Sequence, residues 1–137
     1  MKNALVDTGP LVAFLNAKDR YHRWARDVLE RIEPPLRTCE AVISEACFLV
    51  RAIRGGPDAV LALVTRGIVE VPFRLDAELA PVRKLMARYA DVPMSLADGC
   101  LVRMSEMAPR ATVLTLASDF RVYRRHGRQV ISVLAPT

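Results

Sequence analysis

The sequence predicts an α/β fold in which helices link the strands of a parallel sheet. Short apolar or β-branched runs, typical of strands, alternate along the chain with longer segments whose apolar residues recur every three or four positions. The first run, Ala4-Leu5-Val6, has no polar residue at alternate positions, as expected for a strand buried on both faces of the sheet.

The first strand is followed by Thr8-Gly9, which turns the chain, and by Pro10, which suits the first position of a helix. An amphipathic helix is expected over residues 20–32, and Pro34-Pro35 ends it before a second strand at 36–39. Later strands are expected at 68–73, 111–116 and 129–134, and later helices at 40–54, 58–66, 76–89, 95–107 and 120–125.

Composition indicates one domain spanning residues 1–137, because 52% hydrophobic residues and a mean hydropathy of +0.17 suffice for a single core. The three cysteines lie in apolar segments and are expected to be buried, reduced thiols. No export signal or membrane span is apparent, so we expect a cytoplasmic protein with no membrane association. A net charge of +5 favours a polyanionic partner.

Four acidic residues are expected at one edge of this sheet. Asp7 follows the first strand, Glu45 lies early in the helix after the second, Asp98 begins the helix before the fourth, and Asp119 follows the fourth. Helices that link parallel strands run antiparallel to them, so helix N-termini and strand C-termini share an edge. If the first and fourth strands are neighbours, the four carboxylates converge in one crevice.

A simpler interpretation exists for each acid taken alone. Glu45 suits the positive end of a helix dipole, Asp98 completes a Ser-x-x-Asp capping box with Ser95, and Asp119 could cap a short helix. Together, however, carboxylates without adjacent basic residues repel each other unless a cation intervenes. An oxygen-only ligand set suits Mg²⁺ or Mn²⁺, which can activate water for phosphodiester hydrolysis.

The motifs that carry these acids resemble those of a known family. Leu5-Val6-Asp7-Thr8-Gly9-Pro10, Ser44-Glu45, Leu96-Ala97-Asp98-Gly99 and Thr115-Leu116-Ala117-Ser118-Asp119-Phe120 are together similar to the PIN domain, and the length and motif order resemble its VapC-type toxins. The resemblance covers essentially the whole chain.

This resemblance implies a three-layer α/β/α sandwich around a parallel sheet of about five strands, and a Mg²⁺- or Mn²⁺-dependent ribonuclease. It also implies a homodimer neutralised by a VapB-like antitoxin whose tail occupies the acidic groove. By the same analogy Asp7, Glu45, Asp98 and Asp119 bind the metal and catalyse hydrolysis, with the hydroxyls of Thr8 and Thr115 supporting them.

Two positions depart from the family pattern. Ala117 stands where relatives often carry an acid two residues before the last one, and Ser95 stands where many have aspartate. These departures bear on metal binding and keep open an alternative, a non-catalytic PIN-like module that binds RNA or a protein.

Other interpretations concern residues outside the four acids. Arg121, Arg124 and Arg125 follow Asp119 closely and are candidates for contacts with RNA phosphates, although a solvated surface explains each of them equally well. His22 is interpreted as a solvated surface residue instead of a general base. Asp-Thr-Gly after an apolar strand also occurs in retroviral-type aspartic proteases, but their nearly all-β fold conflicts with the helical periodicity.

Overall fold

A computed structural model describes residues 1–136 and contains a five-stranded parallel sheet with strand order β3-β2-β1-β4-β7. Its strands are short: β1 (Ala4–Val6), β2 (Leu36–Arg37), β3 (Val69–Glu70), β4 (Thr112–Leu114) and β7 (Val133–Leu134). β1 lies in the centre and pairs with β2 on one side and with β4 on the other. The expected adjacency of the first and fourth strands is therefore confirmed.

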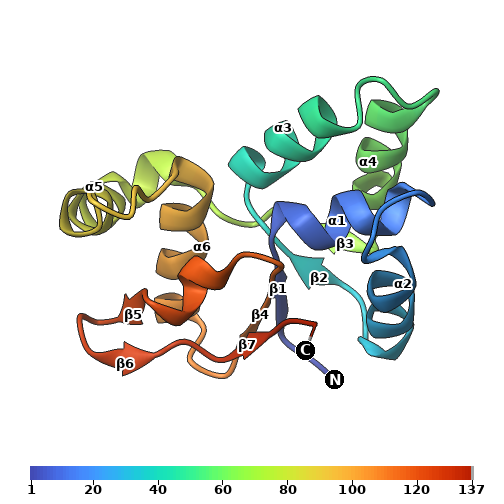
Figure 1. The fold of residues 1–137 in the computed structure, drawn as a ribbon. Coiled ribbons are helices and arrows are strands. Elements are labelled where there is room, and N and C mark those ends of the chain that lie inside the picture. The colour runs from blue at the N-terminus through green and yellow to red at the C-terminus, as the bar shows by residue number, and fades with distance from the viewer. Residues whose placement is uncertain (137) are drawn as a thin grey trace.

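Helices cover both faces of the sheet, which makes three layers (Figure 1). One layer holds α1 (Thr8–Leu15), α2 (His22–Arg31), α3 (Glu40–Leu49) and α4 (Gly56–Thr65), which contact one another. The other holds α5 (Leu79–Arg88) and α6 (Leu96–Met107), and α6 packs against β1 and β4. The α/β/α fold is confirmed, and the nearly all-β alternative is wrong.

The sheet core consists of the apolar runs identified in the sequence. Every residue of β1 is buried, with exposed fractions of at most 2%, which agrees with a strand covered on both faces. Cys39 and Cys100 are buried, Cys47 is half-buried, and all three are free thiols as expected. Across residues 1–136, no helix is long and apolar enough to cross a membrane.

Two helices differ from the sequence-based expectation at their ends. The helix expected over 40–54 stops at Leu49, because the turn that follows brings Gly56 against the backbone of Val50 and α4 starts there. The helix expected over 76–89 is divided into a 3-10 turn, η1 (Leu75–Ala77), and α5.

The largest difference lies near the C-terminus. The helix expected over 120–125 is wrong: η2 (Ser118–Arg121) is a single 3-10 turn, and β5 (Arg124–Arg125) forms an antiparallel hairpin with β6 (Gln129–Val130). The strand expected over 129–134 is consequently divided between β6 and β7. His126 and Gly127 adopt positive φ angles of 49° and 82° in the hairpin turn, a conformation that glycine favours and the helical interpretation overlooked.

Candidate functional site

Asp7 lies at the carboxyl end of β1, where the pairing with β4 determines its surroundings. Val6 is opposite Leu114, and the backbone N–H of Asp7 donates to the Leu114 carbonyl at 2.9 Å. The next residue of the β4 segment, Thr115, donates its hydroxyl to Asp7 Oδ2 at 2.7 Å. The N–H of Thr8 donates to Oδ1 at 2.8 Å, so both oxygens of this buried carboxylate are held.

Asp7 also caps helix α1, and Gly9 permits the close packing that this position requires. A Cβ atom at Gly9 would lie 3.0 Å from Cγ of Leu116, which follows Thr115. The turn Asp7-Thr8-Gly9 thus brings the start of α1 against the segment after β4. The motif serves the packing of two strand ends as well as the placement of an acid.

Glu45 is joined to this edge through Thr8. Glu45 is an exposed residue in the middle of α3, and its Oε2 accepts a hydrogen bond of 2.8 Å from the Thr8 hydroxyl. Thr8 therefore links two acids, through its backbone N–H to Asp7 and through its side chain to Glu45.

Asp98 approaches the same edge from the first turn of α6. Its backbone N–H donates to the Ser95 hydroxyl at 3.1 Å, as the capping-box interpretation predicts. The reciprocal half of the box is not among the hydrogen bonds of residues 1–136, because Asp98 Oδ2 instead accepts from the Tyr123 hydroxyl at 2.8 Å. The Asp98 carboxylate is thus directed toward the segment that follows β4.

Asp119 is half-buried in the 3-10 turn η2. Its backbone carbonyl accepts from the N–H groups of Val122 and Tyr123. Its carboxylate is close enough to Asp98 to raise the pKa of that residue. Asp119 therefore belongs electrostatically to the group formed by the other three acids.

Burial, with repulsion between neighbouring carboxylates, disfavours the ionisation of Asp7 and Asp98. Burial raises the pKa of Asp7 to about 6, with Asp98 and Glu45 adding repulsion and the hydrogen bonds from Thr115 and Thr8 opposing the shift. Burial likewise raises the pKa of Asp98, again with repulsion from Asp119 and Glu45. None of the ion pairs found in residues 1–136 involves any of these four carboxylates.

The chemistry of this donor set fits a hard divalent cation. All four groups are carboxylates, which Mg²⁺ and Mn²⁺ prefer, and a cation would relieve their mutual repulsion. In the arrangement of residues 1–136, no three His, Cys, Asp or Glu side chains are close enough together to hold one ion. Three of these carboxylates would therefore bind one ion only after moving closer together than they lie in this structure.

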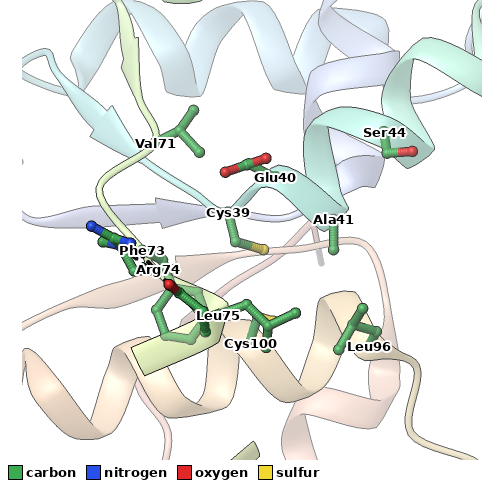
Figure 2. A pocket seen from close by; sticks show the side chains of 11 residues that line it. Cys39, Glu40, Ala41, Ser44, Val71, Phe73, Arg74, Leu75, Leu96 and Cys100 are labelled. Carbon is green, nitrogen blue, oxygen red and sulfur yellow. Dashed lines mark hydrogen bonds and ion pairs between the residues drawn. The ribbon is translucent and has the colours of Figure 1, made fainter. Parts of the chain in front are cut away.

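Two cavities adjoin α3. One, of about 460 Å³, is lined by Ser44, Glu45, Phe48 and Leu49, so it contains one of the four acids. The other, of about 780 Å³, also includes Ser44 and lies between α3 and α6. Figure 2 shows Cys39, Ala41 and Ser44 on one side of it, and Leu96 and Cys100 on the other. The shared Ser44 makes the cavities neighbours along one helix.

The predicted phosphate-binding arginines differ in their surroundings. The Arg124 guanidinium donates from Nη1 to the carbonyls of Arg121, Val122 and Tyr123, and Arg125 donates to the Ser105 carbonyl and to Gln129. Both side chains therefore have structural partners within the chain. Arg121 is exposed, and its guanidinium makes no hydrogen bond or ion pair among those of residues 1–136.

The remaining residues singled out in the sequence have local roles. His22 is half-buried, with Nδ1 2.8 Å from the Ala13 carbonyl, so the interpretation as a solvated residue is wrong. The N–H of Ala117 donates to the Thr115 hydroxyl at 2.9 Å, which orients the group that holds Asp7. Ser95 caps α6, a function that aspartate would also perform.

Sequence reasoning missed Tyr123, the partner of Asp98. Tyr123 lies between η2 and β5, in the segment 120–125 for which the sequence wrongly predicts a helix. A tyrosine near the last acid is a weak signal, because the contact with Asp98 spans 25 positions and depends on where α6 lies.

The charge of Asp7 should cost stability in the metal-free protein. Its pKa is about 6 when folded and near 3.8 when unfolded, so the folded state loses stability as pH rises between these values. Asp7→Asn should therefore raise the free energy of unfolding by about 1–3 kcal/mol near pH 7. The gain is smaller if the NH₂ group of the new amide faces one of the hydrogen-bond donors that Asp7 accepts from.

The measurement is urea denaturation with EDTA at about pH 4 and about pH 7. The advantage of the variant should be small at the lower pH and largest at the higher one. Equal advantages at both values would contradict the raised pKa of Asp7.

Comparisons with known proteins identify the family of the chain. The chain is 27% identical over 115 residues to Ribonuclease VapC26 of Mycobacterium tuberculosis, which covers 82% of this chain and 84% of that protein. The crystal structure of VapC20 from the same organism, described as a sarcin-ricin loop cleaving toxin, superposes with a TM-score of 0.72 at 23% identity, covering 87% of this chain and 93% of that one. Residues 4–120 match the PIN domain family. The chain is therefore a member of the PIN domain family.

Proposed function

We propose that the protein is a Mg²⁺- or Mn²⁺-dependent endoribonuclease and the toxin of a VapBC-type toxin–antitoxin pair. The observation that carries this proposal is the gathering of four carboxylates from four different segments, none of which forms an ion pair within residues 1–136. The similarity to a named ribonuclease over most of both chains supports the reaction class.

In this proposal Asp7, Glu45, Asp98 and Asp119 hold the metal. A bound Mg²⁺ or Mn²⁺ supplies an activated water and stabilises the charge that develops on the phosphoryl oxygens. The chain's own hydroxyls orient the acids: Thr115 holds Asp7, and Thr8 holds Glu45. The four carboxylates also repel phosphate when no cation is present, so RNA cleavage should depend strictly on added metal.

Removal of one metal-binding charge tests the reaction directly. Asp98→Asn should abolish RNA hydrolysis and saturable Mn²⁺ binding, because the amide keeps the shape of the side chain but removes its charge. Asp27→Asn is the matched control, since Asp27 is exposed on α2 and should leave both properties unchanged.

The assays are calorimetric titration of Mn²⁺ and cleavage of a mixed RNA substrate, with and without EDTA. Hydrolysis by Asp98→Asn at the parental rate would contradict the assignment of the acids. If the parent protein binds RNA equally well with and without EDTA and does not hydrolyse it, a non-catalytic PIN-like module would be favoured.

Arg121 is the basic residue best placed to test phosphate contact, because Arg124 and Arg125 already have partners inside the chain. Arg121→Ala should weaken RNA binding similarly for different sequences and should reduce the salt slope by about one unit. Arg110→Ala is the control, an exposed arginine at the opposite end of β4. Equal salt slopes for the two variants would contradict the contact.

A protein partner is the second part of the proposal. Phe48 and Leu49 on α3 are 60% and 55% exposed and share a cavity with Glu45, which suits a surface that another protein covers. We propose that the chain forms a homodimer and that a VapB-like antitoxin blocks its acidic groove. Light scattering of the purified chain tests the first part, and a monomeric mass at micromolar concentration would contradict it.

A further inference from the structure

Tyr123 is a fully enclosed aromatic residue near the acids. It is fully buried, and its ring packs edge-on against Phe120 at 5.3 Å and against Tyr89 at 5.1 Å between centroids. Packing alone would be satisfied by phenylalanine, because a buried hydroxyl is costly unless it forms a hydrogen bond. The Tyr123 hydroxyl must therefore form an interaction that phenylalanine could not provide.

The two buried tyrosines of this cluster use their hydroxyls differently. The Tyr89 hydroxyl accepts from the backbone N–H of Arg124 at 2.9 Å, which fixes the hairpin β5–β6 to α5. The Tyr123 hydroxyl donates to Oδ2 of Asp98 at 2.8 Å. The Tyr89 hydroxyl therefore binds a backbone group, whereas the Tyr123 hydroxyl binds an acid.

We propose that Tyr123 is a positioning residue that fixes the Asp98 carboxylate for a divalent cation. This inference rests on the proposed function and adds to it a residue whose hydroxyl contacts one of the proposed metal-binding acids, Asp98. The hydroxyl occupies Oδ2, while Ser95 anchors the backbone N–H of the same residue, so the side chain is restrained at both ends. In this proposal the cation binds the other oxygen, Oδ1. Hydrogen bonds to carboxylate ligands orient them and favour metal binding.

The test compares Tyr123→Phe with Tyr89→Phe, which removes the neighbouring hydroxyl from the same aromatic cluster without touching an acid. Mn²⁺ is titrated calorimetrically into each variant and into the parent protein, and thermal unfolding in EDTA checks that each variant folds. We expect Mn²⁺ to bind about tenfold more weakly to Tyr123→Phe and with parental affinity to Tyr89→Phe.

RNA hydrolysis measured against Mn²⁺ concentration provides a second readout. In Tyr123→Phe the half-saturating Mn²⁺ concentration should rise by the same factor as the dissociation constant, and the rate should recover at saturating metal. A purely structural role would lower the unfolding temperature without shifting this concentration.

Each other outcome overturns the inference in a distinguishable way. Parental Mn²⁺ affinity in Tyr123→Phe, with binding still lost in Asp98→Asn, would reject the role of Tyr123 and leave the proposed function intact. Equal weakening in both tyrosine variants would show a general effect of the aromatic cluster. Absence of Mn²⁺ binding and hydrolysis in the parent protein would reject both proposals.

Discussion

The parallel pairing of β1 with β4 is the interaction on which the acidic edge depends. Its register places Val6 opposite Leu114, so that Asp7 and Thr115 emerge side by side and their side chains meet at 2.7 Å. A slip of one residue would turn the two side chains to opposite faces of the sheet. Because both strands are buried in the centre of the sheet, this register is strongly specified by the core.

The burial of a carboxylate at the same edge lowers the stability of the fold. A buried carboxylate such as Asp7, without a basic partner, opposes folding at neutral pH. The surrounding hydroxyls and backbone N–H groups moderate this cost but do not neutralise the charge. Such an arrangement is unusual for a residue that serves only packing, and perturbed acids grouped in this way are typical of functional sites.

The fold and the location of the four acids could be predicted, because buried strands and amphipathic helices leave strong periodic patterns. The C-terminal segment could not: its strands are two residues long, and Arg124 and Arg125 sit in a hairpin determined by the turn at Gly127. The Tyr123–Asp98 contact and the carbonyl partners of Arg124 could not be predicted either, because both depend on how this segment folds and packs in three dimensions. The number of arginines in this segment therefore exceeds the number whose guanidinium groups are free to bind a ligand.

Asp7 follows β1 at the edge of the sheet, Glu45 and Asp98 lie in α3 and α6 of the two helical layers, and Asp119 lies in η2. They are separated by long stretches of chain, so no fragment that lacks one layer contains the complete set. A ligand bound by all four would join the two layers across the sheet edge and act as a non-covalent cross-link. Occupancy of the site would then protect the whole molecule against proteases, including helices that touch no acid.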